Sequence, residues 1–215
     1  MFYLDLDAHF GDGVQAAFAD EPRVFTLSIH ESGRWPMART DASATGPGSL
    51  YDRAGGVARN LPVPAGFNNS EMSFLLGEAV LPLMAAFRPD AVVVQCGCDA
   101  LADDPMTGLA LSNRVFFEAI RAVMAIAPRL LVLGGGGYNP WAVGRCWAGV
   151  WATLNGLPLP ERLPDQAREV MAGVRWNHRW GRCPQERWLS ALVDDVRPGP
   201  VRDEIRMMAA VARLP

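Results

Sequence analysis

The chain has 215 residues, of which half are hydrophobic and a fifth are charged, with a formal net charge of −3. This composition predicts one globular domain with a sizeable core and no affinity for nucleic acid or an anionic membrane. All 20 basic residues are arginine, which excludes the lysine of a Walker A loop, a kinase or a Schiff-base enzyme. No apolar run approaches the roughly 18 residues of a membrane span. No secretion signal opens the chain, so we expect a cytoplasmic protein.

Strands and helices alternate along the first 156 residues. Short apolar runs predict strands at 2–6, 24–29, 57–63, 91–94 and 130–133. Helices are expected between and after these strands, at 12–19, 70–87, 112–127 and 140–154. The alternation predicts an α/β fold in which helices flank both faces of a parallel sheet.

Local signals refine this pattern. Asn68 and Glu71 have the spacing of a capping box at the start of the long helix, and Pro82 is expected to kink it. Residues 31–69 are rich in Gly, Pro, Ser and Asn, which predicts a long connection. Beyond residue 156 the chain is rich in Pro and Trp and ends in a predicted helix at 201–213. We therefore expect an α/β domain at 1–156 and a helical extension at 157–215 that packs on it.

Polar side chains interrupt the first apolar strand. Asp5, Asp7 and His9 are spaced two residues apart, so an extended backbone that persisted to His9 would place all three on one face. Burying two carboxylates and an imidazole without partners is costly, and a bound cation would offset that cost. The alternative is that Asp5 pairs with an arginine while Asp7 and His9 cap the following turn. Asp12 has the character of a helix N-cap.

Two further strands end next to polar residues. Asp99 follows the strand at 91–94, and Tyr138 follows the strand at 130–133. Open parallel sheets bind ligands at the carboxyl ends of their strands, so we expect these side chains to meet Asp7 and His9 at one edge. Asp, His and Asp form the three-ligand set of a catalytic zinc, and a tyrosine is suited to donate to an oxyanion.

The glycine run Gly134–Gly137 raises the alternative of a dinucleotide site. The G-x-G-x-x-G pattern fails, because the sixth position is Asn139 or Pro140, and no acidic residue lies about 20 residues further on. The run is better explained by a backbone that approaches a ligand closely.

Three segments in this order resemble signatures of the histone deacetylase family: YLDLDAHFGDGVQ at 3–15, QCGCDALADDPM at 95–106 and LGGGGY at 133–138. SIHESG at 28–33 and YNPW at 138–141 are most similar to its bacterial branch, the acetoin utilization proteins. The resemblance spans about residues 2–155. It implies the arginase/deacetylase-like α/β fold and hydrolysis of the acetyl-amide of acetyl-lysine in proteins or of acetylated small amines.

The resemblance also implies roles for individual residues. Asp7, His9 and Asp99 would hold Zn²⁺, or Fe²⁺, which the same ligands tolerate. Tyr138 would stabilise the oxyanion, and the carboxylates of Asp5 and Asp12 would orient the catalytic histidines. K⁺ or another monovalent cation would be held by Asp5, Asp7, His9, Ser28 and Ile29, partly through backbone carbonyls. The acyl pocket would be lined by Met106 and Gly136.

The chain departs from the family upstream of the metal strand. The family's tandem His-His, which acts as general base and acid, precedes that strand, whereas this chain begins at it. His30 and His178 are not paired, and Phe10 replaces a histidine common after His9. We therefore expect the C-terminal portion of a deacetylase, lacking the N-terminal strands and active only with a segment that supplies the histidines. The alternative is a metal-binding but inactive remnant or interaction module. Either way, an unpaired sheet edge should favour aggregation.

Overall fold

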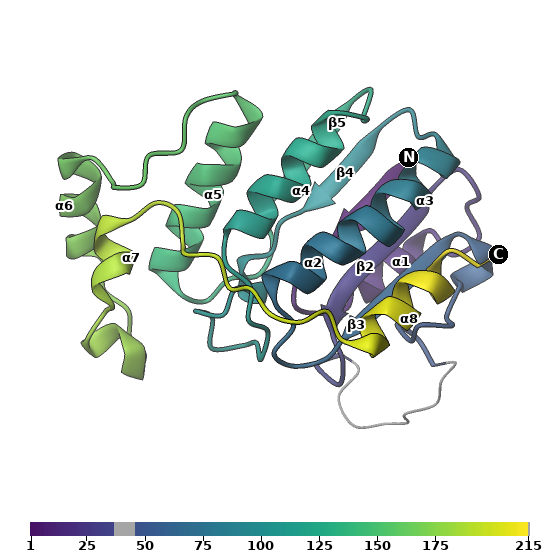
Figure 1. The fold of residues 1–215 in the computed structure, drawn as a ribbon, viewed down its shortest axis with the longest axis horizontal. Helices are drawn as coiled ribbons and strands as arrows, with labels where there is room; N and C mark the ends of the chain where they lie inside the picture. Colours follow the sequence, from purple (N-terminus) through teal and green to yellow (C-terminus); the bar gives the residue numbers. More distant parts are fainter. Residues whose placement is uncertain (37–45, 215) are drawn as a thin grey trace.

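A five-stranded parallel sheet forms the centre of the protein (Figure 1). The computed structural model describes residues 1–36 and 46–214, so the connection expected at 31–69 lies partly outside the described residues. The strands are β1 (Phe2–Asp5), β2 (Phe25–Glu31), β3 (Ala58–Val63), β4 (Val92–Gln95) and β5 (Leu130–Leu133). Their order in the sheet is β3-β2-β1-β4-β5, which places β1 in the middle. Phe2 of β1 pairs with Phe25 on one side and with Val92 on the other.

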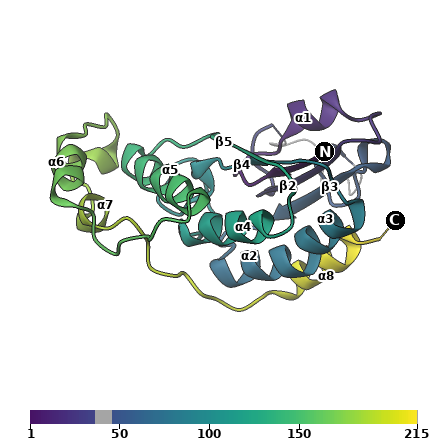
Figure 2. The ribbon, with the colours of Figure 1, turned by 90° about the horizontal axis from the view of Figure 1, so that it is seen from above.

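Helices flank both faces of the sheet, which confirms the predicted α/β class. Figure 2 shows α1 (Asp12–Ala17) on one face, and α2 (Asn69–Leu75), α3 (Leu81–Phe87), α4 (Arg114–Met124) and α8 (Asp203–Ala212) on the other. The side chains of the two strands β1 and β2 are buried on both faces by these layers. One continuous core therefore contains Phe2 and Leu4 of β1, Leu27 of β2, Val94 of β4 and Phe116 of α4.

The predicted helix at 70–87 is one helical run with a distorted middle. The capping box is present: the Asn68 side chain accepts a hydrogen bond from the Glu71 amide at 3.2 Å, and Glu71 accepts one from the Asn68 amide at 3.1 Å. A wide π-type turn at Leu76–Val80 precedes Pro82, whose missing N–H breaks the helical hydrogen-bond pattern. By length and apolar composition alone the helical run 69–87 is long enough to cross a membrane, contrary to the expectation from the sequence, but core helices of soluble proteins have the same properties.

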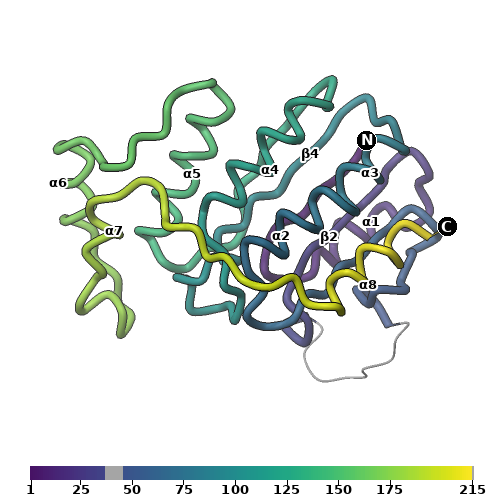
Figure 3. The backbone as a smooth tube through the Cα atoms, in the orientation of Figure 1, coloured from purple at the N-terminus to yellow at the C-terminus, as the bar shows by residue number. Residues whose placement is uncertain are grey.

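The C-terminal extension occupies two separate places. After α5 (Pro140–Leu154), helices α6 (Asp165–Gly173) and α7 (Glu186–Ser190) lie beside α5 at one end of the molecule. The chain then runs back past α5, α4 and α2 to α8, as the tube in Figure 3 shows. Helix α8 packs beside β3 and α2. The domain boundary at 156 stays a prediction.

The edge strand β5 exposes apolar side chains. Leu131 is 54% exposed and Leu133 40%, and Trp151 of α5, which is 61% exposed, lines an apolar cavity of about 250 Å³ with Leu133. Strand β5 pairs only with β4 among the described residues. An unpaired apolar edge of this kind is a template for association with other chains.

We expect Leu131→Arg to reduce self-association of the chain, because a charge on an edge strand opposes edge-to-edge pairing. Size-exclusion chromatography with light scattering over a concentration series would measure the change. Val170→Arg is the matched control, since Val170 is also exposed but lies on α6. Equal self-association of the wild type and Leu131→Arg would refute the role of β5.

Candidate metal centre

Two loops at the carboxyl end of the sheet bring Asp7, His9 and Asp99 together. Strand β1 ends at Asp5, so Asp7 and His9 lie in the loop that follows it. Asp99 lies in a short 3₁₀ turn (Cys98–Ala100) beyond β4, the parallel neighbour of β1. One potential ligand atom from each residue lies within 4.8 Å of the other two. The three residues therefore meet as expected, although through adjacent loops and not through strand alternation.

Hydrogen bonds within the protein hold the carboxylates of Asp7 and Asp99 in place. His9 Nδ1 lies 3.1 Å from Asp7 Oδ1 and 2.9 Å from Asp99 Oδ2. Asp7 Oδ2 accepts a hydrogen bond from Gln95 Nε2 and one from the Gly136 amide, each at 2.9 Å. Asp99 Oδ1 accepts one from the Ala8 amide at 3.0 Å. The carboxylate positions are thus set by the surrounding chain.

Two glycines border these carboxylates without space for a side chain. A Cβ added at Gly97 would lie 2.1 Å from Asp7 Oδ2, and one added at Gly136 would lie 2.0 Å from Asp99 Oδ2. Gly136 was expected in the site, whereas Gly97 and Gln95 were not identified from the sequence. Gly97 and Gln95 both contact the Asp7 carboxylate, and the spacing of residues in the sequence does not show where that carboxylate lies in the fold.

The charges of the centre suit a cation. Hydrogen bonds with Asp7 and Asp99 raise the pKa of His9 to about 10. Burial raises the pKa of Asp99, and it would also raise that of Asp7, but hydrogen bonds from His9 and Gln95 outweigh it and lower the Asp7 pKa. Throughout 1–36 and 46–214, His9 is the only cationic group within ion-pair distance of either carboxylate. Once a metal displaces the proton of His9, its imidazole nitrogen and the two buried carboxylates form a donor set that fits a divalent ion such as Zn²⁺.

Asp5 lies behind the centre and does not pair with an arginine in the described part of the chain. Its carboxylate accepts hydrogen bonds from the Tyr3 hydroxyl at 3.0 Å and from the Asp7 amide at 3.1 Å. Burial raises its pKa to about 7. The alternative of an Asp5–arginine pair is therefore wrong for the described residues. Its second part is present, because the Asp7 carboxylate caps the turn by accepting a hydrogen bond from the His9 amide at 2.9 Å.

Tyr138 follows β5 and the glycine run, half-exposed beside the centre. Its amide donates to Asp104 Oδ2 at 2.6 Å. Burial, and then the negative charges of Asp99 and Asp7, raise the pKa of Tyr138, so its hydroxyl is protonated at neutral pH and able to donate.

Comparisons with known proteins identify the family. The histone deacetylase domain model matches residues 1–154. The chain belongs to the histone deacetylase family. Acetoin utilization protein AcuC of Bacillus subtilis is 33% identical over 86% of this chain and 46% of its own length. The crystal structure of an HDAC homologue from Aquifex aeolicus is 33% identical, has a TM-score of 0.86, and is matched over 99% of this chain and 57% of that one. An HDAC homologue complexed with SAHA matches with the same TM-score at 32% identity and the same shares.

These matches cover the described fold but not the whole of the relatives. The chain spans about half the length of AcuC and of the two solved HDAC homologues. The TM-score confirms the arginase/deacetylase-like fold for the part that is present.

Other residues that the histone deacetylase resemblance assigns are placed as follows. Asp12 is exposed, its carboxylate accepts from the neighbouring Gly13 amide at 2.8 Å, and Gly11, not Asp12, is the N-cap of α1. Ser28 is buried and pairs in register with Asp5, and Ile29 follows it, also buried. The monovalent-cation assignment therefore stays a prediction.

The expected pocket residue Met106 is 43% exposed, and its amide donates to Asp104 Oδ1 at 2.9 Å. Its place in an acyl pocket is untested.

The two remaining histidines have other partners. His30 is fully buried, with Nδ1 2.9 Å from Ser28 Oγ and Nε2 3.1 Å from the Gly48 carbonyl oxygen, and burial lowers its pKa to about 4. The His178 ring stacks on Trp176 in the extension, with ring centroids 4.4 Å apart. Neither forms a histidine pair beside the candidate metal centre.

Proposed function

We propose that this chain carries the metal centre of a zinc-dependent deacetylase that hydrolyses the acetyl-amide of acetyl-lysine or of an acetylated small amine. The observation that supports this most directly is the convergence of Asp7, His9 and Asp99 within 4.8 Å at the carboxyl ends of β1 and β4. Membership of the histone deacetylase family supports the same reaction class. A cytoplasmic location is part of the proposal.

The chain's own residues account for binding and for charge stabilisation. Asp7, His9 and Asp99 would hold the divalent ion, with both carboxylates fixed by hydrogen bonds from the surrounding chain. When bound, this ion would polarise the acetyl carbonyl and activate a water. Tyr138 would donate its hydroxyl proton in a hydrogen bond to the developing oxyanion, a contribution of roughly 10²–10³ in rate.

Proton transfer needs groups that these residues do not provide. All three histidines of the chain are accounted for, because His9 is a candidate ligand while His30 and His178 are engaged elsewhere. We therefore propose that a further polypeptide segment, in cis or in trans, supplies the general base and acid. Loss of such groups costs roughly 10²–10⁴ in rate.

The second candidate function is a metal-binding but catalytically inactive module. The lack of a His-His pair in this chain favours it, because the three candidate ligands could bind a metal without providing a group for proton transfer. The deacetylase proposal predicts slow hydrolysis by this chain, whereas the inactive module predicts no hydrolysis.

A hydrolysis assay on the zinc-loaded chain tests the proposal. We expect slow, chelator-sensitive release of acetate from an acetyl-lysine peptide, and a further loss of about 10²–10³-fold in Tyr138→Phe, because an oxyanion donor is removed. Tyr51→Phe is the matched control, since Tyr51 is equally exposed in another loop.

Two results would contradict the proposal. Zinc binding without any turnover would support the inactive module. A rate equal to that of an intact deacetylase would contradict the need for an additional segment.

A further inference from the structure

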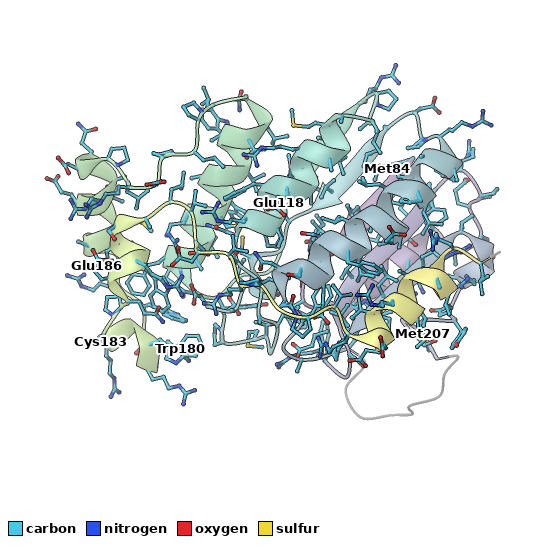
Figure 4. The ribbon with its side chains drawn as sticks, in the orientation of Figure 1. Met84, Glu118, Trp180, Cys183, Glu186 and Met207 are labelled. Carbon is cyan, nitrogen blue, oxygen red and sulfur yellow. The ribbon has the colours of Figure 1, made fainter. Side chains whose placement is uncertain are left out.

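A buried carboxylate of the α/β core is held by the C-terminal extension. Asp103, only 7% exposed, forms an ion pair with Arg187, and its Oδ2 accepts a hydrogen bond from Trp188 Nε1 at 2.8 Å. Arg187 and Trp188 both belong to α7. Arg197 adds a longer contact, with its Nη2 3.7 Å from Asp103 Oδ1. Figure 4 labels Glu186, the first residue of α7, at the end of the molecule formed by α6 and α7.

The segment that contains Asp103 also positions the backbone of Tyr138. The next residue, Asp104, accepts hydrogen bonds from the Tyr138 amide at 2.6 Å and from the Asn139 amide at 3.2 Å. The Asp103 carbonyl oxygen accepts one from Asn139 Nδ2 at 2.9 Å. Asp103, which α7 holds, and its neighbour Asp104 therefore contact Tyr138 and Asn139. These two residues connect the glycine run to α5.

Helix α7 also contacts the first turn of α5 directly. The rings of Trp141 and Trp188 are stacked, with centroids 5.7 Å apart and an interplanar angle of 18°. Trp141 Nε1 also donates to the Met171 carbonyl oxygen of α6 at 2.9 Å. Asn139 caps α5 by accepting from the Trp141 amide. The first turn of α5 thus contacts the extension through a ring stack and a hydrogen bond.

We propose that Asp103 is a positioning residue for Tyr138, held in place by Arg187 and Trp188 of the extension. This inference rests on the proposed role of the Tyr138 hydroxyl. The Tyr138 side chain is half exposed, and the Tyr138 and Asn139 amides are both held by the Asp104 carboxylate, so the backbone at this point helps to set where the ring lies. A hydroxyl that stabilises an oxyanion must be held within about 0.5 Å of its productive position. The extension is therefore part of the catalytic architecture.

Amide hydrogen exchange tests the positioning without any ligand. In Trp188→Phe, which keeps a ring but removes the N–H, we expect the Tyr138 and Asn139 amides to exchange about 2- to 10-fold faster, the effect of one lost hydrogen bond. Arg187→Gln is the second variant, since Arg187 is partly exposed and its replacement is milder to the core. Trp151→Phe is the matched control, because Trp151 is an exposed tryptophan of α5, the helix that follows Asn139. Unchanged exchange in both variants would overturn the inference.

Binding of acetohydroxamic acid to the zinc-loaded chain tests the consequence for the site. We expect Trp188→Phe to weaken hydroxamate binding about 3- to 10-fold while zinc affinity is unchanged. In a Tyr138→Phe background the same substitution should have no further effect, because the coupled hydroxyl is absent. Equal weakening in both backgrounds would show a general structural effect and overturn the inference. A wild type that binds zinc but no hydroxamate would contradict the proposed function, and the amide exchange would still decide the role of Asp103.

Discussion

Replacing Asp99 by alanine is expected to lower the affinity of the chain for Zn²⁺ by at least about 100-fold. Even residues that only orient metal ligands cost 10- to 100-fold when removed, and Asp99 would be one of three direct ligands. Its carboxylate is fully buried and points at His9 Nδ1 from 2.9 Å. Competition titration against a zinc chelator of known affinity would measure the loss. Asp165→Ala is the control, because Asp165 is an exposed carboxylate on α6.

The same variant separates metal binding from folding. Asp99→Ala leaves the Ala8 amide without its acceptor, which costs about 1–3 kcal/mol in the apo protein. Zinc at 100 times its dissociation constant should stabilise the wild type by about 2.7 kcal/mol and the variant hardly at all. Thermal unfolding with and without zinc measures both quantities. Equal stabilisation of the wild type and Asp99→Ala would exclude Asp99 as a ligand.

The sequence predicted the sheet well because most of its strands are short runs of apolar, often β-branched residues between turn-forming segments. The predicted segments 91–94 and 130–133 match β4 and β5 to within one residue. Strand β2 extends two residues beyond its predicted end, through His30 and Glu31. These polar residues are buried in the strand because their side chains have partners: Glu31, for example, accepts from the Gly108 amide at 2.8 Å. Such partners come from distant segments, so the sequence pattern does not reveal them.

Helices α6 and α7 were not predicted, for a related reason. Helix α6 has no buried residue, and its apolar residues at helical spacing are only Ala167, Val170 and Met171, while α7 has only five residues. Their contribution comes from single contacts, such as the hydrogen bond from Trp188 to Asp103. Contacts of this kind depend on where α7 lies in space, and composition does not indicate that position.

The candidate metal centre was predictable in its residue types and not in its geometry. The rule that strand ends carry ligands identified Asp7, His9 and Asp99, although β1 ends at Asp5 and the ligands lie in loops. Gln95, which donates to Asp7 at 2.9 Å, begins the segment QCGCDALADDPM, but it was given no role because its contact with Asp7 depends on the fold and not on local spacing. The candidate centre therefore consists of three candidate ligands and a hydrogen-bonded frame that positions them, and the sequence reveals only the candidate ligands.

Gly136→Ala tests that frame directly, and we expect it to weaken zinc binding by about 10- to 100-fold. The backbone of Gly136 has no positive φ, so alanine meets no conformational barrier there. Its Cβ would instead lie 2.0 Å from Asp99 Oδ2 and 3.0 Å from Asp7 Oδ2, and the two carboxylates would have to move apart from their present positions. Both are held by hydrogen bonds, so the crowding should also cost about 1–3 kcal/mol of folding free energy.

Gly144→Ala is the matched control, because Gly144 lies inside α5 and an added Cβ would meet no atom within 4 Å. Alanine there should stabilise the protein by about 0.5–1 kcal/mol through helix propensity and leave zinc affinity unchanged. Chelator competition and urea denaturation of the two variants provide the comparison. If Gly136→Ala bound zinc as tightly as Gly144→Ala, the carboxylates of Asp7 and Asp99 would not need their present positions for binding. A metal site would then lie elsewhere, because the Asp7, His9 and Asp99 side chains cannot keep their present positions with a methyl group 2.0 Å from the Asp99 carboxylate.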